Sequence, residues 1–368
     1  MASFNLVVFL GEVIIVGAGF VGSFLAYLLA KSGISVTVFE EDKTIGFPQH
    51  CAGLISLSGL KRLGILPSVS SRGLIVNRIR NFRIHAEDKT LMTRITSTIV
   101  GVIDRPGLDM LIAEKAMGYG AVFKLGSRVK ELRNNGVRFS GGVYNGDIIV
   151  DAEGARRILL RKFIGSDTPG SIPALQLEVK VDSVEDTNTA DVYLNTPDFF
   201  SWVIPLDNST ARVGVASRYI ANRYKFLKDL SKKHFMRFKI IKNFGGLVHV
   251  DGPCKRFTFG NAVAVGDAAG QTKPTTGGGV VFGGLSAAIL AKVIEKNLEI
   301  GMPLEFYDRI WRRVFSSNIR FMMYARRMLY MVNPRVVLRV LLGFLPTSSV
   351  DVSSDFDFQL DFISRLFH

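Results

Sequence analysis

The distribution of apolar residues near the start of the chain predicts a strand, a turn and a helix. Residues 13–30 read VIIVGAGFVGSFLAYLLA, a run of 18 residues without a charged side chain. A run of this length is typical of a membrane-spanning helix. However, three glycines interrupt it, β-branched residues precede them, and helix-forming residues follow them. We therefore expect a buried strand, a tight turn and a buried helix.

The middle of the chain has the alternating pattern of half-buried strands. Residues 73–96 predict hairpin strands. Residues 174–195 and 199–217 predict a meander whose turns fall at DTNT and LDNST. These segments together predict an antiparallel sheet. Two short apolar runs, residues 148–150 and 262–265, predict buried strands of a different kind, because they do not alternate.

Helices predominate toward the end of the chain. Residues 280–296 predict one helix and residues 304–345 predict several, whereas we expect the segment after Pro346 to pack loosely. Residues 304–345 contain eight Arg and two acidic residues, interleaved with aromatic residues and Met. A basic amphipathic helix of this kind can lie in a membrane interface, or it can dock on the protein with a solvated basic face. Residues 225–244 leave the same two alternatives open.

Composition narrows the class of protein. A chain of 368 residues predicts two or three structural units. Its 46 basic and 32 acidic side chains give a formal charge of +14, which favours nucleic acid, an anionic membrane or a phosphorylated ligand. No nucleic-acid-binding motif is present, so we expect no nucleic acid partner. Cys51 and Cys254 are far apart, and no metal-ligand spacing occurs, so we expect no metal and a reducing, intracellular setting.

The first eleven residues, MASFNLVVFLG, have no positive charge before their apolar run. They therefore make a poor signal peptide. An extra edge strand and an overextended start both remain open.

A dinucleotide-binding fingerprint follows the first predicted strand. Gly17, Gly19 and Gly22 form G-x-G-x-x-G at the turn into the helix. The first glycine permits the tight bend, the second lets a pyrophosphate approach the backbone, and the third lets helix and strand pack closely. The next strand ends at Glu40, where a carboxylate can bind a ribose diol. Strand, turn, helix, strand and acid together predict dinucleotide binding.

Two later segments carry the same type of chemistry. The predicted strand 148–150 ends in Asp151-Ala152-Glu153-Gly154, and the strand 262–265 ends in Gly266-Asp267. Residues 277–279 are three glycines, which permit a further close approach of backbone to ligand. A ligand that contacts segments so far apart in the chain must be long.

The motifs GAGFVG, CAGLIS, DRPGLD, DAEGA and GDAAGQTKPTTGGG resemble those of the geranylgeranyl reductase family. This family belongs to the FAD-dependent proteins with the p-hydroxybenzoate hydroxylase-like fold. The resemblance extends from about residue 12 to about residue 300. It implies an enzyme that saturates isoprenoid chains, including those of archaeal ether lipids.

The resemblance implies the cofactor FAD and a set of residues that contact it. Glu40 would hold the adenosine ribose, Val129 would contact adenine through its backbone, and Asp267 would bind the ribityl and pyrophosphate region. The full implied set is Gly17, Ala18, Gly19, Val21, Gly22, Glu40, Cys51, Ala52, Leu54, Arg105, Val129, Gly266, Asp267, Gly279 and Val280.

The fold class that follows is α/β (α+β). It comprises a Rossmann-like FAD-binding domain, an antiparallel β-sheet substrate domain and a C-terminal helical region. The expected boundaries are 1–75, 101–165 and 251–300 for the FAD-binding domain, 76–100 and 166–250 for the substrate domain, and 301–368 for the helical region.

Two motifs depart from the family pattern. Glu153 stands where the family has Asp, which changes the geometry expected at that turn. The family's Tyr-x-Trp-x-Phe-Pro motif appears as FSWVIP, so Phe200 replaces the Tyr and Ile204 replaces the Phe. The resemblance implies that Phe200, Trp202 and Pro205 contact the substrate. Phe200 and Trp202, two residues apart, can form the wall of an apolar site or belong to the core of the sheet.

Cys51 has two roles left open by the sequence. Its neighbour His50 would point to the opposite face of an extended segment, which argues against a Cys–His catalytic pair. The thiol is then either a neighbour of the cofactor or a redox-active, catalytic group beside the flavin. We favour the first, because Ala52 and Gly53 permit close approach of the backbone to a flat ring.

The predicted function is an FAD-dependent reductase that saturates C=C double bonds of geranylgeranyl or other isoprenoid chains of membrane lipids. The alternatives are a flavin-dependent monooxygenase or halogenase, and a flavin electron-transfer protein at the membrane. The sequence leaves the external electron donor open between a nicotinamide, a ferredoxin and another carrier. We expect a cytoplasmic protein attached peripherally to the inner face of the cell membrane.

Overall fold

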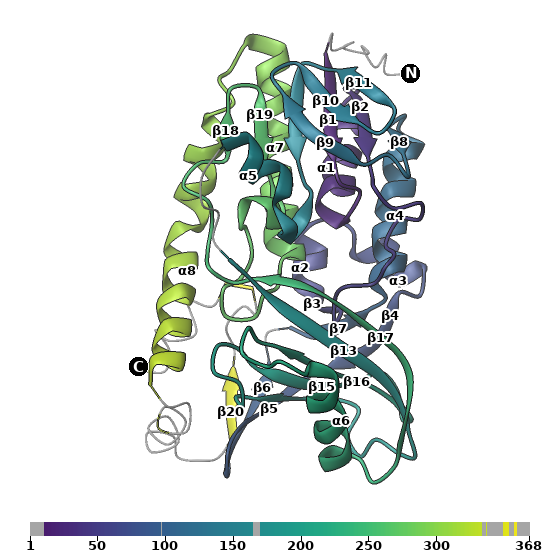
Figure 1. Ribbon diagram of the computed structural model, residues 1–368, viewed down its shortest axis with the longest axis vertical. Helices are drawn as coiled ribbons and strands as arrows, with labels where there is room; N and C mark the ends of the chain where they lie inside the picture. The colour runs from purple at the N-terminus through teal and green to yellow at the C-terminus, as the bar shows by residue number, and fades with distance from the viewer. Residues whose placement is uncertain are drawn as a thin grey trace.

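A six-stranded, mostly parallel sheet forms one half of the molecule (Figure 1). The computed structural model describes residues 11–96, 98–164, 170–332, 336, 349–352 and 357–358. The strand order is β18-β19-β12-β1-β2-β8, and only β18 is antiparallel to its neighbour. The bounds are β1 (Glu12–Val16), β2 (Ser35–Phe39), β8 (Val122–Lys124), β12 (Ile148–Asp151), β18 (Thr258–Phe259) and β19 (Ala262–Ala264).

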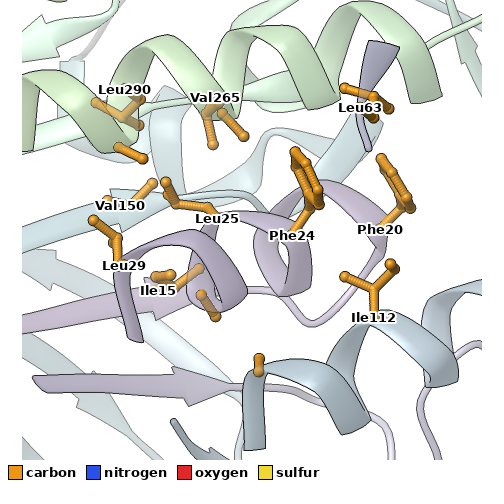
Figure 2. Packing of buried hydrophobic residues seen from close by; sticks show 14 of the residues in the cluster. Ile15, Phe20, Phe24, Leu25, Leu29, Leu63, Ile112, Val150, Val265 and Leu290 are labelled. Carbon is orange, nitrogen blue, oxygen red and sulfur yellow. The ribbon is translucent and has the colours of Figure 1, made fainter. Parts of the chain in front are cut away.

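Helices cover this sheet because its central strands are apolar on both faces. They are α1 (Phe20–Lys31), α4 (Arg105–Gly118) and α7 (Val280–Ile300), and α1 packs against both others. Figure 2 shows Phe20, Phe24, Leu25 and Leu29 of α1 between Ile112 of α4 and Leu290 of α7. The strand, turn and helix expected over residues 13–30 are confirmed. Among the helices described, none is both long enough and apolar enough to cross a membrane.

An eight-stranded sheet forms the other half, with strand order β17-β13-β16-β15-β14-β5-β6-β20. Its strands are β5 (Asn81–Ala86), β6 (Lys89–Ile95), β13 (Ser171–Val181), β14 (Thr189–Tyr193), β15 (Ser201–Pro205), β16 (Thr210–Ala216), β17 (Phe238–His249) and β20 (Ser349–Val352). The expected hairpins β5–β6 and β15–β16 are present, the second with its turn at LDNST. The hairpin expected at DTNT is wrong, because β16 and β15 lie between β13 and β14 in the sheet, and β14 pairs with β15 and β5 instead. The sheet is not wholly antiparallel, because β14 runs parallel to β5 and β20 runs parallel to β6.

The remaining elements are smaller. They are the sheet β3 (Leu54–Ser56), β4 (Ile75–Ile79) and β7 (Val100–Ile103), the sheet β9 (Val129–Arg133), β10 (Gly136–Phe139) and β11 (Gly142–Asn145), the helices α2 (Leu57–Arg62), α3 (Leu66–Ser71) and α5 (Ile158–Ile164), and the 3-10 turns η1 (Gly154–Arg156) and η2 (Gly266–Ala269).

Two expectations for the helical segments are wrong. Residues 225–244 are not one amphipathic helix, because α6 (Arg223–His234) ends and β17 begins within them. Phe238 and Ile240, two residues apart, both pack against the cluster beneath α6, which requires a strand. The segment after Pro346 is not loosely packed where it is described, because β20 extends the sheet and Asp357 is buried.

The long helix α8 (Phe306–Met331) runs along one side of the molecule (Figure 1). Tyr307, Trp311, Phe315, Ile319 and Met322 face the core, which confirms a helix with one docked face. The two alternatives for residues 1–11 fall on residues that, except for Gly11, lie outside the described part of the chain.

Candidate active site

One large cavity lies between the two halves and is lined by both. Its volume is about 1450 Å³, above the usual range of about 300–1,000 Å³ for a site that holds one small molecule. Glycine-rich turns of the six-stranded half line one part. Apolar side chains of the eight-stranded sheet, among them Phe82, Ile84 and Trp202, line the other part, together with the last turns of α8.

The first glycine turn has room for a ligand only where the fingerprint predicts it. Gly17 has a φ of +104°, and a Cβ there would lie 2.4 Å from the carbonyl oxygen of Ala152. A Cβ at Gly22 would lie 2.0 Å from the carbonyl oxygen of Gly17. These two glycines therefore serve packing. A Cβ at Gly19 would meet no protein atom within 4 Å, and Gly19 lines the cavity at the start of α1.

Glu40 follows β2 and lies against the same turn. Its carboxylate accepts hydrogen bonds from the backbone N–H of Ala18 at 2.6 Å and of Asp42 at 2.9 Å. Burial raises the pKa of the Glu40 carboxyl, although these two hydrogen bonds oppose the rise. The carboxylate is thus fixed in the cavity wall, beside the glycine turn.

Asp267 and the triple glycine meet on another part of the wall. A Cβ at Gly279 would lie 2.5 Å from Oδ1 of Asp267, so only glycine permits this approach. Arg157 donates a hydrogen bond from Nε to the carbonyl oxygen of Asp267 at 2.9 Å. Burial raises the pKa of the Asp267 carboxyl. Gly279 and Val280, which begin α7, also line the cavity.

The thiol of Cys51 and the imidazole of His50 contact different parts of the protein. The guanidinium of Arg105 donates to Asp109 Oδ1 at 3.0 Å and lies beside the Cys51 thiol. Burial opposes its charge, but Asp109, with a smaller effect of Cys51, raises the pKa of Arg105 above its usual range. The His50 ring turns toward β17, where Nδ1 lies 2.9 Å from the carbonyl oxygen of Gly245. The two side chains therefore make no catalytic pair.

Aromatic residues of the eight-stranded sheet form another part of the cavity wall. Phe199 stacks on Phe200 with ring centroids 4.1 Å apart, and Phe200 makes an edge contact with Trp202 at 5.8 Å. The indole Nε1 donates to Gln176 Oε1 at 3.2 Å. Phe200, Trp202 and Ile204 all line the cavity, whereas Val203 packs on the far face of the sheet.

Comparisons with known proteins agree with this arrangement. Residues 12–62 match a family described as FAD dependent oxidoreductase. A digeranylgeranylglycerophospholipid reductase of Methanothermobacter thermautotrophicus is 28% identical over 352 residues, covering 86% of this chain and 87% of that protein. An uncharacterized protein of Methanocaldococcus jannaschii is 30% identical over 330 residues, covering 84% of this chain and 81% of that protein. The chain belongs to the geranylgeranyl reductase family.

Solved structures share the fold of this reductase-family chain. A geranylgeranyl bacteriochlorophyll reductase-like protein from Thermoplasma acidophilum superposes with a TM-score of 0.84 at 22% identity, covering 97% of this chain and 95% of that one. The flavin-dependent brominase Bmp2 gives a TM-score of 0.72 at 17% identity, covering 90% of each chain. The predicted α/β (α+β) fold class is confirmed.

The chain is thus an FAD-dependent oxidoreductase. The cavity fits this cofactor, because Gly19 leaves open space at a helix N-terminus, where phosphate binds favourably. Glu40 stands at the position expected for a ribose contact. Most of the residues implied for FAD line this cavity: Gly17, Ala18, Gly19, Val21, Glu40, Cys51, Ala52, Leu54, Arg105, Asp267, Gly279 and Val280.

Four of the expected site residues do not line the cavity. Gly22 packs against the glycine turn, and Gly266 packs against Val21. The Val129 side chain is buried in a cluster on the other side of the six-stranded sheet. Pro205 ends β15, and its carbonyl oxygen accepts a hydrogen bond from Asn77.

The departure from the family at Glu153 has a local explanation. Its carboxylate accepts hydrogen bonds from the backbone N–H groups of Ile158, Leu159 and Leu160, at 2.8–3.0 Å. These are donors at the start of α5, which need acceptors outside the helix. The longer acid therefore caps α5 across the turn.

Several residues in the cavity wall, or directly behind it, could not be expected from the motifs. Arg212 of β16 donates from Nη1 to the carbonyl oxygen of Ala52 at 2.8 Å and pairs with Glu178 at 3.2 Å. Lys273 pairs with Asp357, and Tyr330 of α8 lines the cavity. The only sequence signal was for Lys273, which lies inside the KPTTGGG motif.

Proposed function

We propose that this enzyme saturates C=C double bonds in the geranylgeranyl chains of a membrane ether lipid. The observation that carries the proposal is one continuous cavity, which joins the glycine turns that fit FAD to a wall of aromatic and aliphatic side chains. Relatives named digeranylgeranylglycerophospholipid reductase support this substrate class. An isoprenoid chain is long, apolar and flexible, which suits an elongated apolar wall.

Bound FAD, once reduced, supplies the hydride for such a saturation. The protein must hold the alkene in position and exclude water, because an unactivated alkene develops no oxyanion that donors could stabilise. Phe200, Trp202 and Ile204 provide apolar contact on one side of the cavity. The hydrogen bond from Trp202 to Gln176 fixes the plane of the indole.

The proposed roles of the remaining residues follow from their places in the wall. The residues that line the glycine-turn half contact FAD. Cys51 is a neighbour of the cofactor, because it lines the cavity. The hydrogen bond from Arg212 to Ala52 and the contact of the His50 ring fix its segment in this position. Val129, Gly22, Gly266 and Pro205 act by packing or through backbone atoms.

An exposed apolar stripe with a basic edge on α8 supports a lipid substrate. On α8, the exposed side chains of Ile310, Val314, Tyr324, Met328 and Met331 recur at helical spacing along one stripe. Arg309, Arg313, Arg320 and Arg327, also exposed, recur along one edge of this stripe. The last turns of α8 also line the cavity. We therefore propose peripheral attachment to an anionic, cytoplasmic membrane face, with access for lipid at this end of α8.

The test is an anaerobic reaction of the purified, dithionite-reduced protein with digeranylgeranylglyceryl phospholipid in vesicles. The expected product gains two hydrogens in mass for each double bond reduced. Absence of any such gain with this lipid and with free geranylgeranyl diphosphate would refute the proposal. Trp202→Ala is the companion variant, expected to lower turnover while FAD stays bound.

The shared fold with the brominase defines a second arm of the same test. A monooxygenase or halogenase consumes oxygen to form product, whereas the proposed reductase forms product without it. Adding NADPH or reduced ferredoxin in place of dithionite then identifies the electron donor.

A further inference from the structure

A buried ion pair lies in the cavity wall. Lys273 Nζ is 2.9 Å from Asp357 Oδ1, and the two side chains are only 5% and 1% exposed. The Ser56 hydroxyl donates to the other oxygen of Asp357 and accepts from the backbone N–H of Gly59. Both charged residues line the cavity, and they lie 84 positions apart in the chain.

The pair has a fixed direction relative to the glycine-rich turn. The Lys273 side chain crosses the face of Gly278, where a Cβ would lie 2.7 Å from Cε and 3.3 Å from Nζ. The Asp357 carboxylate lies on the side of α2, near Gly59. The backbone also closes this loop, because Gly277 N–H donates to the Lys273 carbonyl oxygen at 2.7 Å. The ammonium end therefore faces the turn that leads into Gly279 and Val280.

Stability alone does not account for this arrangement. Removing two charges from water costs several kcal/mol for each ion, and well-packed apolar residues often replace such a pair without loss. The pair also contributes a strong local field, since charges interact more strongly in a water-poor cavity than in solvent.

We propose that the Lys273–Asp357 pair sets the reduction potential of the bound flavin. This inference rests on the proposed function, and it places the flavin ring beside Gly279 and Val280, which begin α7 and line the cavity. Two-electron reduction adds negative charge to that ring, and charge near its nitrogens tunes its electronics. The ammonium of Lys273 favours the reduced form, and the carboxylate of Asp357 limits that effect. Asp357 acts as a positioning residue, because it also fixes the ammonium over Gly278.

Potentiometric titration of the FAD-bound protein against a reference dye tests the inference. Asp357→Asn leaves the cation uncompensated and is expected to make the midpoint potential more positive. Lys273→Met removes the cation and is expected to make it more negative. The expected size is about a tenfold change in the reduced-to-oxidised ratio, about 30 mV for a two-electron couple.

The controls are Lys296→Met and Glu299→Gln, which change the same charges in an exposed pair on α7. Their potentials should equal that of the unchanged protein. If the ion pair only holds two segments together and has no electrostatic effect on the flavin, the midpoint potentials of the two cavity variants should stay unchanged or shift in the same direction. Either result overturns the inference. If Lys273→Met does not retain FAD, Asp357→Asn alone decides by the sign of its shift.

The absorption spectrum of bound FAD separates this inference from the proposed function. A protein that binds no flavin contradicts the proposed placement of the cofactor. A flavoprotein that reduces lipid, yet has equal potentials in all variants, contradicts only the role of the ion pair.

Discussion

The indole of Trp202 occupies the space above Gly214, its partner in the β15–β16 pair. A Cβ at Gly214 would lie 2.2 Å from Cε2 and 2.4 Å from Nε1 of that indole. Because Gly214 of β16 has no side chain, the Trp202 indole of β15 can lie against its backbone and form part of the apolar wall. The missing side chain of Gly214 defines the position of Trp202 in the cavity.

Gly214→Ala is expected to push the indole away from Gln176 and into the cavity. FAD affinity should stay within twofold, because no glycine turn is altered. Turnover of the isoprenoid lipid should fall about tenfold or more, as expected for an aromatic ring displaced in a packed site. Flavin absorbance and anaerobic product mass measure the two effects. Equal turnover in the variant would contradict the assigned role of this wall.

Gly19→Ala should separate folding from cofactor binding. Gly19 has an ordinary backbone conformation, with φ −65° and ψ 178°, and a Cβ there meets no protein atom. The free energy of unfolding without FAD should change by about 0.5 kcal/mol or less. The added methyl group should weaken FAD binding at least tenfold. Gly118→Ala, at an exposed glycine that ends α4 and has nothing within 4 Å, is the control and should bind FAD normally.

The buried imidazole of His249 is expected to reduce the free energy of unfolding in acid. Burial, with the nearby charge of Arg157, lowers the pKa of His249 to about 4. The unfolded state, with a pKa of about 6.5, binds a proton between these values that the folded state does not bind. The free energy of unfolding is therefore expected to decrease as pH falls from 7 to 4, by about 3 kcal/mol from this residue.

His249→Gln should flatten this part of the pH dependence. Glutamine can still donate to the carbonyl oxygen of Gly252, which His249 Nε2 contacts at 2.7 Å. Urea unfolding at pH 7 and pH 4.5 measures the difference between the two proteins. An equal decrease in both would show that other groups govern the acid response.

The basic edge of α8 should govern attachment to membranes. Changing Arg309, Arg313, Arg320 and Arg327 to Gln is expected to reduce sedimentation with anionic vesicles about tenfold or more at low salt, since each basic residue near such a surface contributes about 1 kcal/mol. The same change at the exposed Lys225, Lys228, Lys232 and Lys233 of α6 is the matched control. Equal losses in both variants would indicate a general charge effect without a role for α8.

The sequence predicted those parts of the site in which neighbouring residues act together. Gly17, Gly19 and Gly22 lie on one turn, so their spacing alone specifies a strand, a bend and a helix. The alternation of Trp202 and Ile204 likewise specifies one face of a strand. In both cases the determining contacts lie within a few residues of chain.

Contacts between distant segments left no such pattern. β20 joins β6 through backbone hydrogen bonds, which almost any sequence can make at a sheet edge. The pairing of Lys273 with Asp357 depends on how the late segment folds back over α2. Residues 225–244 were misjudged because charged residues obscured the two-residue period of Phe238 and Ile240.

The order of strands in the six-stranded sheet also determines when this sheet can form during synthesis of the chain. β1 pairs with β12 through Val13 and Ile148, and β12 pairs with β19 through Ile149 and Ala262. During synthesis, β12 therefore has an unpaired apolar edge until the segment containing Ala262 has left the ribosome. Folding of this half should be slow, because loops this long must close before the contacts form. Cells that produce the protein faster than chaperones can shield that edge should accumulate it as aggregates.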